Sequence, residues 1–257
     1  MSGLVEQAGS KLPRPATWDA RRVALVSLSV CYAVLWVGGV AQHWLKVGSD
    51  INQSLAAALF LTLAGLLVLV GASSRRERLL LLAVALLGFA AEVVGVHAGV
   101  PFGAYEYTDA LGPRMFGVPL VMASAWMTLA GYVKQMLARF SLAAWAETLI
   151  AASWLTAFDL LIDPLASNQL GYWRWAERGA YFGVPLKNFA GWFVVSLLAF
   201  TALRKKFEAG QTASLTGLSI ILFFTLLALA HGLPLVALPG CALCVVHFLV
   251  SRAARWR

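Results

Sequence analysis

Charged residues are scarce in this chain of 257 residues, because Asp, Glu, Lys and Arg together make up only 12% of it. An ordinary soluble domain carries about 25% charged residues and about 45–50% apolar ones. Here the hydrophobic share is 60%, which leaves too little polar surface to cover a water-facing globule of this size. The composition therefore argues against a soluble enzyme, a disordered chain and a nucleic-acid-binding domain.

Cysteine and the common cofactor motifs are also missing or rare. The three cysteines are too few, and too apolar in their surroundings, for a disulfide framework. The sequence contains no phosphate-binding glycine loop, no nucleotide fingerprint, no HExxH motif and no Cys/His cluster with metal-ligand spacing. We therefore expect neither a cofactor nor a metal ion.

Long apolar runs are present instead, and they have the length of about 20 residues that is needed to cross a bilayer. The predicted spans are 23–43, 53–72, 79–100, 117–137, 142–163, 184–203, 213–231 and 234–250. They should be helices, because runs this long and this uniformly apolar do not fit barrel strands. The predicted fold class is all-α, a polytopic transmembrane helix bundle of about eight spans. Seven spans are the alternative, since Pro234 and Pro239 interrupt the last two short runs.

The positive residues indicate how the chain is oriented. Of the 20 Lys and Arg residues, fifteen fall on the side of the N-terminus and five on the other side. Such an excess marks the cytoplasmic face, so we predict a multi-pass protein of the inner (cytoplasmic) membrane with both termini in the cytoplasm. The net charge of +8 is then a topology signal, and no nucleic acid is expected as a partner. Residues 1–22 are predicted to be a polar, disordered tail, and residues 23–257 a single transmembrane domain.

A five-residue segment, Phe-Gly-Val-Pro-Leu, occurs at 116–120 and again at 182–186, and Trp126 matches Trp192 at the same offset. Each copy follows a helix and a Gly/Tyr/Trp-rich loop and precedes a returning helix. We interpret the two units, about 85–137 and 150–203, as parallel repeats. A duplicated packing element without chemistry is the alternative.

Four carboxylates, Glu92, Glu147, Asp159 and Asp163, fall inside predicted spans, where a charge costs a few kcal/mol and therefore usually faces a cavity or a partner. Glu147 lies near the cytoplasmic end of its span, where its side chain can reach the interface. Glu92 lies on a stripe of small residues with Gly88 and Gly95, and small residues let another helix approach closely. Asp159 and Asp163 lie four apart on one helix face. In a low dielectric we expect this pair to share one proton, as an acid beside its conjugate base. The alternatives are structural hydrogen bonding for Glu92 and a helix that simply ends after Asp163.

Aromatic residues crowd the two loops on the side opposite the termini. An anchoring belt at the membrane interface explains part of this pattern, but not the charges interleaved in Tyr105-Glu106-Tyr107 and Trp173-Arg174-Trp175. Aromatic faces stabilise cations. The predicted substrate-binding residues are Tyr105, Tyr107, Trp173, Trp175, Asn188 and Trp192.

Several of these segments together resemble the carotenoid biosynthesis membrane proteins of the CruF type. The similar segments are Glu92 with Gly-Val-Pro-Phe-Gly-Ala-Tyr-Glu-Tyr (99–107), Leu-Gly-Pro (111–113), Gly-Val-Pro (117–119), Asp159-x-x-x-Asp163-Pro164, Trp173-x-Trp175, and the stretch from Gly183 to Trp192 that includes Asn188. The resemblance covers roughly residues 85–200, a little under half of the chain.

The resemblance implies a carotenoid hydratase that adds water to the terminal 1,2 (or 1′,2′) double bond of an acyclic end group, without a redox cofactor. The residues fit such chemistry, because alkene hydration needs a proton donor, shelter for a tertiary cation and a group that orients water. Asp159, Asp163 and Glu92 are the predicted catalytic residues. The expected partners are a lipophilic carotenoid, the lipid bilayer and other enzymes of the carotenoid pathway. A proton-coupled transporter and a carotenoid cyclase are the alternatives.

Overall fold

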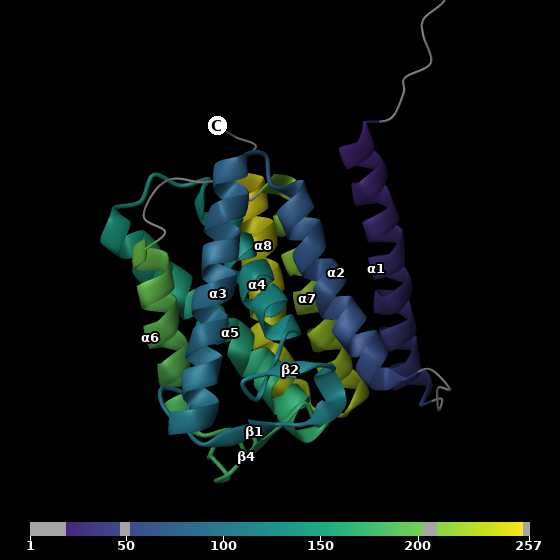
Figure 1. The fold of residues 1–257 in the computed structure, drawn as a ribbon, viewed down its shortest axis with the longest axis vertical. Coiled ribbons are helices and arrows are strands. Elements are labelled where there is room, and N and C mark those ends of the chain that lie inside the picture. The colour runs from purple at the N-terminus through teal and green to yellow at the C-terminus, as the bar shows by residue number, and fades with distance from the viewer. Residues whose placement is uncertain (1–18, 47–51, 203–209, 254–257) are drawn as a thin grey trace, which may run out of the picture.

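The structure is a computed structural model that describes residues 19–46, 52–202 and 210–253. Within these ranges the chain forms a bundle of eight helices, and short strands gather at one end of it (Figure 1). The helices are α1 (Ala20–Leu45), α2 (Gln53–Gly71), α3 (Arg75–Ala98), α4 (Val121–Leu137), α5 (Ala144–Asn168), α6 (Leu186–Ala202), α7 (Gly210–Ala230) and α8 (Pro234–Ala253). The short elements are β1 (Tyr105–Tyr107), the 3-10 helix η1 (Asp109–Leu111), β2 (Arg114–Met115), β3 (Val118–Pro119) and β4 (Trp173–Trp175).

The predicted all-α fold is confirmed, and each of the eight predicted spans corresponds to one helix. Six helices are long and apolar enough to cross a bilayer, namely α1, α2, α3, α5, α7 and α8. Both α4 and α6 have 17 residues, about three residues short of a full crossing. The chain is therefore a multi-pass membrane protein. Residues 1–18 of the predicted tail and the basic residues 204–206 lie outside the described residues.

The two ends of the bundle differ. The beginning of α1 and the end of α8 lie at one end, and β1 and β4 lie at the other (Figure 1). Since β1 pairs with β4, the loops that follow α3 and α5 meet at the same face. This arrangement agrees with an even number of membrane crossings and with the two aromatic loops lying on the same side of the membrane, opposite the termini.

Polar contacts tie α1 to the edge of the bundle, although only Tyr32 of this helix is buried. The Tyr32 hydroxyl lies 2.8 Å from the Ser219 hydroxyl on α7, and the Trp36 indole donates to the Ser219 carbonyl at 2.8 Å. Near the start of α1, Arg21 donates to the last carbonyls of α2 at 2.8–3.2 Å. These carbonyls have no partner within their own helix, so Arg21 caps α2 and fixes α1 beside it.

The fifth helix does not end at Asp163-Pro164, so the alternative reading of that pair as a helix stop is wrong. It continues to Asn168 with Pro164 inside it. Proline cannot donate to the carbonyl four residues earlier, which is that of Leu160. The Tyr181 hydroxyl donates to this carbonyl at 3.2 Å. A side chain thus replaces the missing backbone hydrogen bond, as transmembrane helices with an internal proline require, and Asp163 stays buried.

The two copies of the repeated segment adopt the same turn. Phe116 and Phe182 have φ angles of 51° and 48°, and the glycines that follow them have φ angles of 78° and 84°. Glycine tolerates this left-handed region at no steric cost. In each copy the turn leads directly into a returning helix, α4 in the first and α6 in the second.

Candidate active site

A two-stranded sheet brings the two aromatic loops together. Strands β1 and β4 are antiparallel, with Tyr105 opposite Trp175 and Tyr107 opposite Trp173. Successive side chains of a strand point to opposite faces, so these four rings share one face and the charges between them share the other. Glu106 and Arg174 are indeed exposed and lie 4.0 Å apart. The interleaved charges therefore belong to the solvent side of the sheet.

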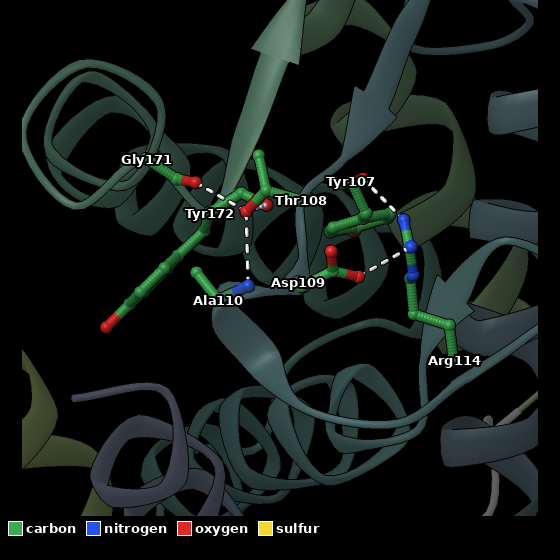
Figure 2. A network of polar contacts seen from close by, with 7 residues as sticks. All are labelled: Tyr107, Thr108, Asp109, Ala110, Arg114, Gly171 and Tyr172. Carbon is green, nitrogen blue, oxygen red and sulfur yellow. Dashed lines mark hydrogen bonds and ion pairs between the residues drawn. The ribbon is translucent and has the colours of Figure 1, made fainter. Parts of the chain in front are cut away.

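Side-chain contacts with the backbone hold this sheet in place, as Figure 2 shows. The Thr108 hydroxyl donates to the Gly171 carbonyl at 2.6 Å, which joins the loop after β1 to the loop before β4. Arg114 donates to the Tyr107 carbonyl at 2.7 Å and pairs with Asp109 at 2.6 Å. The inward rings of the sheet are thus fixed from the loop side.

Glu92 on α3 points into the bundle, as the stripe of small residues predicts, and is 4% exposed. Its Oε2 accepts the hydroxyls of Tyr105 at 2.5 Å and Tyr107 at 2.9 Å. Its Oε1 accepts the indole N–H of Trp126 at 3.1 Å. A side-chain carbon at Gly88 would collide with the Trp126 ring, so glycine there is what lets α4 bring this indole to Glu92.

The two tyrosines remain hydrogen-bond donors. Burial, and after it the negative charge of Glu92, raise the pKa of Tyr105 well above the usual value of a phenol. The same two causes raise the pKa of Tyr107. Because both phenols hold their protons firmly, they act as hydrogen-bond donors that orient Glu92.

Asp159 and Asp163 are buried on one face of α5, as their spacing predicts. Asp163 Oδ1 accepts the indole N–H groups of Trp173 at 3.0 Å and Trp175 at 3.1 Å. The Asn188 amide on α6 donates to Oδ2 of Asp163 at 2.7 Å and to Oδ2 of Asp159 at 2.5 Å. Asn188, predicted from the sequence as a substrate contact, is thus the bridge between the two aspartates.

Each of the two aromatic loops donates hydrogen bonds to one carboxylate in the same pattern. Glu92 receives three donors, two from β1 and one from a returning helix, and Asp163 likewise receives two from β4 and one from a returning helix. At the repeat offset of 66 residues, Glu92 lies one position from the counterpart of Asp159. By hydrogen bonding its counterpart is Asp163, and Asp159 stands apart, since Asn188 is its only donor among the described residues.

Trp126, which the sequence indicated only as a match within the repeat, also belongs to the site, and Phe102 and Met122 join the lining of the polar pocket. The Trp126 ring stacks on that of Trp192, with centroids 4.3 Å apart and planes 8° from parallel. The stack joins α4 to α6 beside Glu92. The equal offset of the two tryptophans in the repeat was the signal that could have identified it.

Two cavities adjoin these groups. A polar pocket of about 250 Å³ is lined by Glu92, Asp163, Asn188 and the rings of the sheet. An apolar cavity of about 650 Å³ lies among α2, α4, α5 and α7, with Asp159 as its one lining carboxylate in the described part of the chain. Met122, Trp173 and Trp192 line both. All nine residues predicted for the site line one cavity or both, and their roles stay predictions.

Glu147, the fourth carboxylate within a span, does not belong to this site. It lies in the first turn of α5, at the opposite end of that helix from Asp163, and pairs with Lys134 on α4 at 2.5 Å. Among the residues that the structure describes, no group of three or more His, Cys, Asp and Glu side chains is arranged to hold a metal ion.

Comparisons with known proteins agree with the resemblance noted in the sequence. The profile of a family described as carotenoid biosynthesis protein matches residues 51–249. The bisanhydrobacterioruberin hydratase of Haloarcula japonica is 30% identical over 141 residues, which cover 53% of this chain and 46% of that relative. The chain thus spans less than half the length of this relative, and no solved structure matches significantly. Because the profile covers most of its length, the chain belongs to the carotenoid biosynthesis protein family.

Proposed function

We propose that this protein is a carotenoid hydratase, which adds water to the terminal 1,2 (1′,2′) double bond of an acyclic carotenoid end group by acid catalysis. The observation that carries the proposal is a set of three buried carboxyl groups at two adjoining cavities, with Glu92 and Asp163 lining the polar pocket and Asp159 lining the apolar cavity. The name of the 30% identical relative, a hydratase, supports the same reaction.

Asp159 is best placed to donate the proton. It alone of the three carboxyl groups lines the apolar cavity, where a hydrocarbon substrate would lie. Its one donor within the described ranges, Asn188, occupies Oδ2, so Oδ1 is the oxygen that can carry the proton. Glu92 and Asp163 each receive three donors, and donors of this kind favour the ionised carboxylate. The site therefore offers one acid and two bases.

The reaction then follows in two steps. The proton of Asp159 bonds to C2 of the alkene with the π electrons of the double bond, which leaves a tertiary cation at C1. A water molecule in the polar pocket bonds to C1 through an oxygen lone pair, and its surplus proton passes to Asp163 or Glu92. Transfer of that proton back to Asp159 restores the acid. The net change is alkene plus water to tertiary alcohol, with no electrons to exchange with a redox cofactor.

Aromatic rings stand where the cation would form. Trp173 and Trp192 line both cavities and thus separate the hydrocarbon from the water. An indole face within about 6 Å of a cation attracts it electrostatically, and more strongly when water is excluded. These two rings would shelter the cation until water adds.

We also propose that the protein lies in the inner membrane with both termini in the cytoplasm, so that the site occupies the opposite half of the bilayer. The excess of Lys and Arg on the terminal side supports this orientation. Reporter fusions after residue 175 and at residue 257 should then report opposite sides. A common side for both fusions would contradict the orientation.

Expression in a host that makes lycopene, followed by mass analysis of the pigments, tests the reaction. The proposal predicts pigments heavier than lycopene by one or two molecules of water. A cyclised pigment of unchanged mass would assign the same cation chemistry to a cyclase. Unaltered lycopene, with the protein present in the membrane, would contradict both enzymes and favour a transporter.

A further inference from the structure

We infer that the apolar cavity is the binding site for the terminal hydrocarbon end of a linear isoprenoid, which it holds with the reactive double bond beside Asp159. This inference rests on the proposed function, because hydration is what requires the double bond at that carboxyl group. It goes further in assigning a separate chamber, distinct from the pocket that holds water, to the end of the substrate.

The shape of the cavity fits a linear chain. Its lining residues on α4 run from Met122 to Leu129, and those on α5 run from Asp159 to Ala166. Seven residues of rise correspond to about 10 Å along a helix, so the cavity extends over about that length parallel to the bundle axis. Since α4 and α5 are antiparallel, Asp159 lies at the same level as Leu129, at the end of the cavity away from the loops. A chain end that fills the cavity therefore reaches the carboxyl group.

The lining favours a hydrocarbon. Leu61, Ile162, Ile220 and Phe224 contribute aliphatic and aromatic surface from three helices. The Thr128 hydroxyl in the lining already donates to the Ser124 carbonyl of its own helix at 2.8 Å. Away from Asp159, a polar end group would lose its hydration there without regaining hydrogen bonds, whereas a branched hydrocarbon end loses nothing.

The size of the cavity limits how much of the substrate enters. The empty space between its walls, about 650 Å³, includes the part that is open to the surroundings. A whole carotenoid is much longer than the 10 Å or so of this chamber. Only one end can enter, and the rest of the polyene has to extend into the bilayer.

Ala125 controls the width of the chamber. It lines the cavity from α4, between Met122 and Thr128, and its small side chain leaves the space open. Ala125→Phe would fill part of the chamber without altering any carboxyl group. Ala90→Phe is the matched control, because Ala90 is exposed on the surface of α3 and its ring would enter lipid.

Photo-crosslinking tests the site without relying on catalysis. Purified full-length protein is irradiated with a linear isoprenoid hydrocarbon that carries a diazirine near its terminal double bond, and the labelled residues are identified by mass spectrometry. We expect label on the segments 122–129 and 159–166, displaced by an acyclic carotene. Ala125→Phe should reduce this displaceable label at least tenfold, and Ala90→Phe should leave it unchanged. The inference would be overturned if label appeared only on lipid-facing residues and acyclic carotene did not displace it.

The same preparations separate this inference from the proposed reaction. Displaceable label in the chamber, in a protein that makes no hydroxylated product, would sustain the binding site and contradict the hydratase. Normal hydration by Ala125→Phe, with no displaceable label in the chamber of the unaltered protein, would sustain the hydratase and overturn the binding site. If Ala125→Phe fails to accumulate, the labelling pattern of the unaltered protein still decides.

Discussion

The Trp126 indole stacks flat on the Trp192 indole, 4.3 Å away, and at the same time donates its N–H to Glu92 at 3.1 Å. Trp192 in turn lines both the polar pocket and the apolar cavity. The two stacked rings therefore connect Glu92, the proposed acceptor of a proton from water, to Trp192. Trp192 is one of the two rings beside which the proposed cation would form. The position of Glu92 and the position of the Trp192 ring depend on each other.

Trp126→Phe should lower turnover about tenfold or more. The substitution keeps an aromatic ring against Trp192 but removes the N–H that Glu92 accepts. A hydrogen bond to a charged group contributes about 1.5–3 kcal/mol, and about 1.4 kcal/mol corresponds to a factor of ten. Steady-state assays of the purified variant would measure the loss, with Trp44→Phe on the exposed surface of α1 as the control. Equal turnover in both variants would show that this hydrogen bond has no part in the reaction.

Asn188→Leu tests whether the bridge between the aspartates positions them. Leucine has nearly the same size but donates no hydrogen bond, so both carboxyl groups lose their common donor. We expect kcat to fall by about 10-fold to 100-fold, in line with about 1.5–3 kcal/mol for such bonds, and its pH profile to shift. KM should change little, because the apolar lining stays intact. A rise in KM alone would mean instead that Asn188 binds substrate directly, as the sequence first indicated.

Glu147→Gln should lower stability and leave catalysis intact. The Lys134 side chain is only 4% exposed and pairs with Glu147, far from the carboxyl cluster. Removing one partner of a buried ion pair costs about 3–5 kcal/mol, and the partly exposed position of Glu147 reduces that cost. Thermal unfolding in detergent should show a lower Tm, with turnover per folded molecule unchanged. Lys134→Met combined with Glu147→Gln should recover part of the Tm, and no recovery would contradict this account of the pair.

The sequence alone predicted the number of helices, the inward carboxylates and the aromatic loops. The reason is that each of these features is local: an apolar run long enough to span, a charge inside such a run, or a cluster of one residue type. Glu92 could be assigned an inward direction because Gly88 and Gly95 share its face. The spacing of Asp159 and Asp163 places both on one face of any helix.

Other features depend on contacts between distant segments, which no local pattern reveals. The continuation of α5 past Pro164 relies on the Tyr181 hydroxyl, which donates to the Leu160 carbonyl from a loop seventeen residues after the proline. The pairing of β1 with β4 joins strands of three residues each, too short to show an alternating pattern. The apolar cavity is lined by five helices and two loops, and its existence depends on how their side chains pack.

The most direct test of the hydratase is to follow the oxygen of water into the product and to compare the purified protein with a variant that lacks the proposed proton donor. The protein is treated with a metal chelator, desalted, and supplied with an acyclic carotene in water enriched in heavy oxygen. Our account predicts a tertiary alcohol that carries the heavy oxygen, formed without any added cofactor. With Asp159→Asn its formation should be slower by at least about 100-fold, the scale on which general acid catalysis contributes. An alcohol that takes its oxygen from air, or an Asp159→Asn variant with unchanged turnover, would contradict the account.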